Sequence, residues 1–167
     1  MQKKEVSIIE IKWEGPYSKT DDFQELNEES HRGLYQLYGT HEIYGSETLL
    51  YLGKARDRAF STRFSEHEKA WFNWQSSAVS LYIGQLGGTE QLNDKDWLNQ
   101  IDEAEKLLIH FCTPPYNSQH IQDYKYQDDI LVLNYGKKKM LPYAVTSVML
   151  NSPYWDQKLW SVYRYSK

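Results

Sequence analysis

One long amphipathic segment, residues 95–112, most constrains what this chain can fold into. Its apolar residues recur every three or four positions and therefore form one stripe on a helix: Trp97, Ile101, Ala104, Leu107, Leu108 and Phe111. Asp94 or Asp96 is suited to cap its first turn, and Pro114-Pro115 should end it. Because such a stripe must be buried, the chain needs a second layer to cover it.

The other apolar segments are short and are typical of strands, since they combine β-branched and aromatic residues and are bounded by turn residues. We predict strands over residues 5–13, 33–38, 48–53, 78–83, 128–136, 143–150 and 158–165. Shorter helices are expected from Thr20 or Asp21 and within residues 56–75. This order predicts an α+β protein with a central, mostly antiparallel sheet.

Glycines indicate where these strands should end. Gly15-Pro16 is expected to end the first strand, and residues 39–47 are expected to form a long hairpin loop. The strand at 78–83 should end at the glycines that follow it, Gly84, Gly87 and Gly88.

A chain of 167 residues is expected to form a single domain, residues 1–167. It has no apolar run near the ~20 residues that span a bilayer, and its N-terminus lacks the features of a signal peptide. Its single cysteine, Cys112, cannot form an internal disulfide. We therefore expect a cytoplasmic protein with no membrane partner.

The net charge of −4 argues against strong nonspecific binding to duplex DNA, which usually needs an excess of basic residues. Nucleic-acid binding would then depend on local charge, and residues 54–69 hold five basic residues against three acidic ones. The 14 tyrosines and six tryptophans suit strands, half-buried surfaces or base-stacking platforms. Composition alone does not separate these uses.

A set of polar and tyrosine residues occurs at distinctive places along the predicted elements. The tripeptides GLY at 33–35 and YLG at 51–53 lie in the two strands of the predicted hairpin. Single polar residues then follow in order: Lys54, Arg63, His67, Glu105 and Asn117. Arg63 and His67 are four residues apart, which places them on one face of a helix.

This ordered set resembles the GIY-YIG nuclease family, which is named after two tripeptides on adjacent strands. The resemblance covers residues 32–118 and includes the helical Arg63 and a run that matches the family's E…LI…P…N pattern: Glu105, Leu108, Ile109, Pro114 and Asn117. It implies a small, mostly antiparallel central sheet flanked by helices. Residues 1–31 and 119–167 would be accessory extensions.

The resemblance also implies a metal-dependent endonuclease that hydrolyses phosphodiester bonds, with DNA as the expected nucleic-acid partner. Glu105 would bind one Mg²⁺ (or Mn²⁺), because a hard cation prefers carboxylate, water and phosphate oxygens. The implied catalytic residues are Tyr35, Tyr51, Arg63, His67, Glu105 and Asn117. The implied substrate-binding residues are Lys54, Arg56 and Arg58.

Each implied role has a chemical reason. The planar guanidinium of Arg63 suits the phosphate oxygens. Tyr35 would orient or deprotonate the attacking water, and as a base its pKa, ordinarily ~10, would have to be lowered by nearby positive charge. His67, ordinarily near ~6.5, could assist as proton acceptor. Tyr51 would hold phosphate or water, and Asn117 would fix the helix end or orient the site.

Taken singly, these residues also have ordinary structural explanations. A tyrosine in a strand packs more often than it catalyses, Arg63 could pair with Glu66 or Asp57, and Glu105 could belong to a solvated helix face. The ordered set favours the nuclease. Two alternatives stay open: a catalytically weak or inactive GIY-YIG-fold binding module with a protein or nucleic-acid partner, and an RNA-directed nuclease or toxin. A double-strand break would need a homodimer or two successive nicks.

Overall fold

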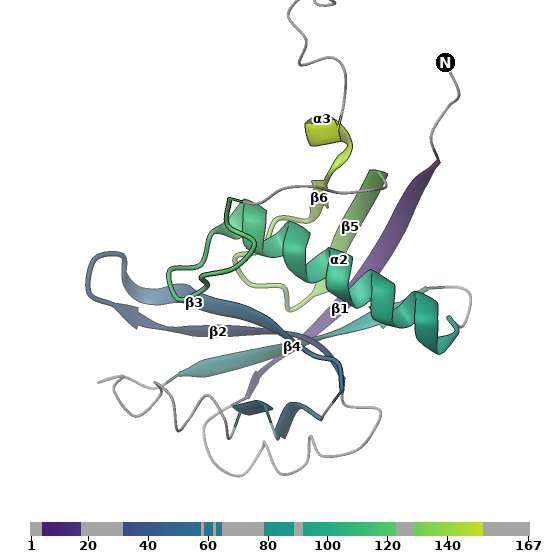
Figure 1. Ribbon diagram of the computed structural model, residues 1–167. Coiled ribbons are helices and arrows are strands. Elements are labelled where there is room, and N and C mark those ends of the chain that lie inside the picture. Colours follow the sequence, from purple (N-terminus) through teal and green to yellow (C-terminus); the bar gives the residue numbers. More distant parts are fainter. Residues whose placement is uncertain are drawn as a thin grey trace, which may run out of the picture.

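A six-stranded sheet organises the part of the chain that the structure describes. The structure is a computed structural model, and it describes residues 5–17, 32–57, 59–61, 63–64, 79–88, 92–122 and 129–151 (Figure 1). The strands in these ranges are β1 (Val6–Tyr17), β2 (Gly33–His41), β3 (Gly45–Ala55), β4 (Ser80–Gly87), β5 (Asp129–Gly136) and β6 (Ala144–Thr146). The helices with defined bounds are α2 (Asp94–Cys112) and α3 (Val148–Asn151).

The strand order in the sheet is β3-β2-β4-β1-β5-β6. Neighbouring strands run antiparallel except for β1 and β5, which pair in parallel from Val6 opposite Asp129 to Trp13 opposite Gly136. The prediction of an α+β protein with a mostly antiparallel sheet is therefore confirmed. The β2–β3 hairpin lies at one end of the sheet, so β3 is an edge strand.

Helix α2 covers one face of the sheet, as its apolar stripe predicts (Figure 1). Its buried residues include Ile101, Leu107 and Leu108, which pack in a cluster with residues of the central strands such as Trp13 and Leu52. This is the second layer that the stripe requires.

The two ends of α2 are capped by residues just outside it. The N-cap is Asn93, whose side chain accepts a hydrogen bond from the Asp96 backbone N–H at 2.9 Å. The prediction of Asp94 or Asp96 as N-cap is wrong, because the first helical turn begins one residue earlier than expected. At the other end, Thr113 adopts a left-handed conformation before Pro114.

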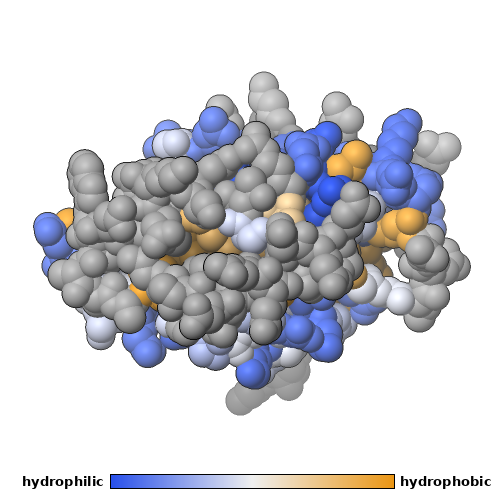
Figure 2. All heavy atoms as spheres, turned by 90° about the horizontal axis from the view of Figure 1, so that it is seen from below, coloured by the Kyte–Doolittle hydropathy of each residue, from blue (hydrophilic) through white to orange (hydrophobic). Residues whose placement is uncertain are grey.

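A second apolar cluster lies on the opposite face of the sheet. It contains Tyr35, Leu37, Ala55, Phe60, Phe64, Val79, Leu81 and Ile83. Phe60 and Phe64 come from a short helical stretch below the sheet (Figure 1), and their rings stack on each other. Figure 2 views the molecule from that side and shows apolar atoms of described residues among hydrophilic ones. The sheet thus has apolar side chains on both faces.

Two predicted strand ends are corrected by the structure. Strand β1 continues through Gly15 and Pro16 to Tyr17, because a register shift between Glu14 and Tyr17 accommodates the proline. Strand β4 ends at Gly87, one of the three predicted glycines. Gly84 instead lies within β4, where a Cβ atom would approach the Trp13 ring to 2.7 Å. The glycine there serves packing rather than a turn.

The hairpin and the C-terminal strand also differ from expectation. Strands β2 and β3 extend further than predicted and pair as far as His41 and Gly45, so the long loop is a short turn over residues 42–44. The strand predicted at 143–150 is only β6, followed by α3. The Thr146 hydroxyl oxygen accepts a hydrogen bond from the Val148 N–H at 3.2 Å, which turns the backbone into the helix.

Some predictions fall outside the described residues. These are the helix from Thr20 or Asp21, the strand at 158–165 and most of the predicted helix within residues 56–75, of which residues 60–61 and 63–64 are described and helical. In the ranges that the structure covers, no helix combines the length and apolar character needed to cross a membrane.

Candidate active site at the edge of the sheet

The two tripeptides meet across the β2–β3 hairpin. Tyr35 pairs with Gly53, and Leu37 pairs with Tyr51, so that both tyrosines lie on the same face of the sheet. Their rings stack with centroids 6.0 Å apart and an interplanar angle of 29°, and the two side chains are hydrogen-bonded. The hairpin register therefore brings the two tyrosines together.

Gly53 makes this approach of the two tyrosines possible. A Cβ atom at this position would lie 2.6 Å from the Tyr35 hydroxyl oxygen and 2.6 Å from Cε1 of Tyr51. Both distances are too short for carbon contacts. The glycine of the second tripeptide thus has a steric reason that does not depend on any resemblance.

Arg63 reaches the tyrosine pair from the helical stretch below the sheet. Phe60 and Phe64 of that stretch pack edge-on against Tyr35, with ring centroids 6.4 and 5.2 Å away. Arg63 lies between them in sequence and hydrogen-bonds Tyr35. Aromatic packing therefore positions the guanidinium beside the two phenols.

Lys54 points to the other face of β3, toward α2. Its ammonium nitrogen lies 2.7 Å from Oε2 of Glu105 and 3.0 Å from Oδ1 of Asp102. Burial lowers the pKa of Lys54, but hydrogen bonds and charge attraction from Glu105 and then Asp102 outweigh it, so the pKa is raised. Arg56 donates to Oδ2 of Asp102 at 2.7 Å. Two cations and two carboxylates thus neutralise each other here.

The side-chain amide of Asn117 hydrogen-bonds to the edge strand β3 in the way that a backbone peptide group of a neighbouring strand would. Its Oδ1 accepts from the Leu52 N–H at 3.0 Å, and its Nδ2 donates to the Leu52 carbonyl at 2.8 Å. The backbone N–H of Tyr116 adds a bond to the Leu50 carbonyl at 3.0 Å. The segment after α2 therefore covers the outer edge of β3 and is held beside the site.

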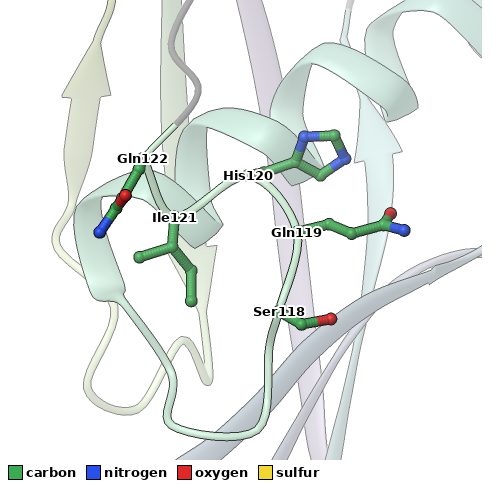
Figure 3. Close-up of a pocket in the computed structure, with 5 residues that line it drawn as sticks. All are labelled: Ser118, Gln119, His120, Ile121 and Gln122. Atoms are coloured by element: carbon green, nitrogen blue, oxygen red, sulfur yellow. The ribbon is translucent and has the colours of Figure 1, made fainter.

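These side chains surround a pocket of about 310 Å³ at the edge of the sheet. Tyr51, Lys54, Arg63, Glu105, Tyr116 and Asn117 contribute to its walls. A neighbouring cavity of about 510 Å³ is lined by the loop of residues 118–122, and Ser118, Gln119 and His120 belong to both. Figure 3 shows Ser118 and Gln119 pointing to the same side of this loop, with Gln122 on the other.

Both tyrosines are held in their neutral form. Burial is the main cause that raises the pKa of Tyr35 well above its ordinary value, and Tyr51 and Glu105 add to it, while Arg63 opposes it. Burial and Glu105 likewise raise the pKa of Tyr51. The Arg63 guanidinium lowers the pKa of Tyr35, but this effect is smaller than that of burial.

Glu105 is the residue of the pocket that could hold a divalent cation. The carboxylate is 8% exposed, opens on the pocket and already binds a cationic group, the Lys54 ammonium. Among the residues described, no group of three or more His, Cys, Asp or Glu could hold a metal. Glu105 would thus be joined by water and substrate oxygens, as Mg²⁺ accepts.

The structure brings six of the predicted site residues together: Tyr35, Tyr51, Lys54, Arg63, Glu105 and Asn117. Arg56 lies beside them through Asp102, whereas Arg58 and His67 are outside the described residues. The pairing of Asp102 with Lys54 and Arg56 was not predicted from the sequence. The spacing of three between Asp102 and Glu105 on a helix was the available signal.

Comparison with known proteins does not assign the chain to a family. No protein-family model, curated protein or solved structure matches the chain.

Proposed function

We propose that this protein is a metal-dependent nuclease of the GIY-YIG type that hydrolyses phosphodiester bonds, with DNA as substrate. The observation that carries the proposal is the convergence of Tyr51, Arg63 and Glu105 on one pocket, with Tyr35 stacked on Tyr51 behind it. These residues come from β2, β3, a helical stretch and α2, and they match in order the polar residues of the family motif.

The site supplies both charge signs that phosphodiester hydrolysis needs. Glu105 would hold Mg²⁺ or Mn²⁺, which when bound polarises a phosphoryl oxygen and stabilises the leaving oxygen. Arg63 has the planar pair of donors that a phosphate group accepts. Lys54 is a second cation at the pocket and becomes available for phosphate when its partner Glu105 is otherwise engaged.

The tyrosines act in this scheme as neutral hydrogen-bonding groups. A protonated phenol can donate to a phosphate oxygen or hold a water through its oxygen. Tyr35 is buried and fixed by Phe60, Phe64 and Arg63, so it is a rigid element of the site. Rigid positioning of the water relative to the phosphate is itself a large part of such catalysis.

The test is cleavage of supercoiled plasmid, single-stranded DNA and RNA in the presence of Mg²⁺, Mn²⁺ or EDTA. We expect cleavage with either metal, none with EDTA, and a loss of at least about 100-fold in Glu105→Gln and Arg63→Met. Glu103→Gln is the matched control, because Glu103 lies on the same helix and pairs with Lys106 instead.

Cleavage of RNA alone would show that RNA, and not DNA, is the substrate. Unchanged cleavage by Glu105→Gln would exclude the pocket at Glu105 as the active site. No cleavage of any substrate by the wild-type protein would favour the binding-module alternative.

A further inference from the structure

An aromatic surface leads from the tip of the β2–β3 hairpin to the pocket. The ring of His41 stacks on Tyr44 with centroids 4.8 Å apart and an interplanar angle of 24°. The same imidazole lies 5.7 Å from the ring of Tyr116, which lines the pocket with Lys54 and Glu105. In Figure 1 the hairpin tip and the loop after α2 accordingly lie at the same end of the sheet.

Water reaches these rings, and hydrogen bonds anchor the ring of His41. Tyr44 is 67% exposed and Tyr116 is 40% exposed, and Ile43 between His41 and the tyrosine is 82% exposed. The backbone N–H groups of Ile43 and Tyr44 donate to Nδ1 of His41 at 3.2 and 3.3 Å. The imidazole is thereby anchored to the turn, so a flat ligand that stacks here loses little affinity to ordering the protein.

We propose that His41, Tyr44 and Tyr116 form a stacking surface for unpaired bases of a nucleic-acid strand whose backbone enters the pocket. This inference rests on the proposed nuclease function and narrows its substrate class to single-stranded regions. An aromatic ring can stack on any base, but only where the base face is not covered by a neighbour, as it is in a continuous duplex.

The surface begins at the pocket, where the phosphate of such a strand would bind, and continues away from it to the hairpin tip. Arg63 and Lys54 at the pocket are the groups that would attract the phosphate, and Tyr116 borders them. Bases next to that phosphate would therefore meet Tyr116 first, and those further along would meet His41 and Tyr44. The surface is uncharged apart from the imidazole, so its contribution to binding should depend little on salt.

The test is the affinity for a fluorescently labelled strand of about 20 nucleotides, longer than the ~4–16 nucleotides that one single-strand-binding fold usually covers. Anisotropy is measured with DNA, RNA and duplex probes, with Ca²⁺ replacing Mg²⁺ to limit cleavage. We expect Tyr44→Ala to raise the Kd for a single strand about fivefold to 150-fold, and Tyr44→Trp to retain binding. Tyr135→Ala is the control, since Tyr135 is also exposed but lies on β5.

A strand with abasic nucleotides separates stacking from other contacts. We expect the wild-type protein to bind it more weakly and Tyr44→Ala to cause no further loss, with an unchanged slope of affinity against salt. An equal loss on normal and abasic strands, a change in Kd below twofold, or tighter binding to the duplex would overturn the stacking surface.

The binding result is independent of cleavage. Binding that depends on Tyr44 without any metal-dependent cleavage would remove the nuclease and leave the stacking surface in place. Cleavage that depends on Glu105, with binding that does not depend on Tyr44, would support the nuclease and exclude the stacking surface.

Discussion

The ammonium of Lys54 lies 2.7 Å from Oε2 of Glu105, so the carboxylate expected to bind a divalent cation is occupied by a cation of the chain itself. The same nitrogen is 3.0 Å from Oδ1 of Asp102. A metal that takes Oε2 of Glu105 has to displace Lys54, and Asp102 offers the displaced ammonium a second partner. In the proposed nuclease, this relationship would couple metal binding at Glu105 to phosphate binding by Lys54.

Lys54→Met should strengthen metal binding and weaken cleavage. Removing the competing ammonium leaves the Glu105 carboxylate open, and a partly buried ion pair of about 1 kcal/mol corresponds to roughly fivefold in affinity for Mn²⁺. Calorimetric titration with Mn²⁺ measures this change directly. Lys106→Met, on the Glu103 side of α2, should leave the affinity unchanged. A weaker affinity in Lys54→Met would mean that the lysine does not compete.

Asp102→Asn should weaken metal binding only when Lys54 is present. In the single variant the displaced ammonium has no second carboxylate, whereas in Lys54→Met/Asp102→Asn there is no ammonium to place. The same calorimetric titration on both backgrounds forms a double-mutant cycle. Equal weakening in both would show that Asp102 acts directly on the metal instead of through Lys54.

Gly53→Ala should destabilise the hairpin and disturb the tyrosine pair. A Cβ atom there meets Tyr35 and Tyr51 at 2.6 Å, and overpacking of this kind costs about 1–3 kcal/mol of unfolding free energy. Urea denaturation measures the cost. Gly87→Ala is a matched control in β4, because no atom lies within 4 Å of a Cβ at that position. Similar losses in both variants would contradict the steric reason.

Asn117→Ala should destabilise the edge of the sheet by about 1–3 kcal/mol, because it leaves the N–H and the carbonyl of buried Leu52 without these bonds. Hydrogen exchange should show lost protection of the Leu52 amide in particular. Asn99→Ala, at an exposed position of α2, should change neither measurement. Retained protection at Leu52 would argue against the peptide-like role of Asn117.

Tyr35 should make the fold sensitive to high pH. Its pKa is raised in the folded state, so above the ordinary value of 10.0 the unfolded chain loses this proton first. The corresponding stability is present below pH 10 and is lost as the pH rises further. Unfolding measured between pH 8 and about pH 11 should show a shallower decline in Tyr35→Phe than in wild type. Tyr44→Phe, at an exposed tyrosine, is the control for the loss of a hydroxyl group.

Local patterns in the sequence determined the elements from which the site is built. The stripe of residues 95–112 predicts α2, because burial of one helix face requires that spacing. The segments 33–38 and 48–53 predict the hairpin, because both are short apolar segments with tyrosines and are bounded by glycines. The order of Tyr35, Tyr51, Arg63 and Glu105 along these elements indicates the candidate site through its resemblance to the GIY-YIG motif.

Only the tertiary structure decided the contacts between distant parts of the chain. Gly84 was interpreted as a strand end, but the Trp13 ring that requires it comes from another strand. Asn117 binds Leu52 across 65 residues, and Lys54 meets Asp102 and Glu105 only because α2 lies over β3. Such pairings depend on register, layer packing and desolvation, which no local spacing encodes. The neutral tyrosines and the ion pair at Glu105 follow from that packing alone.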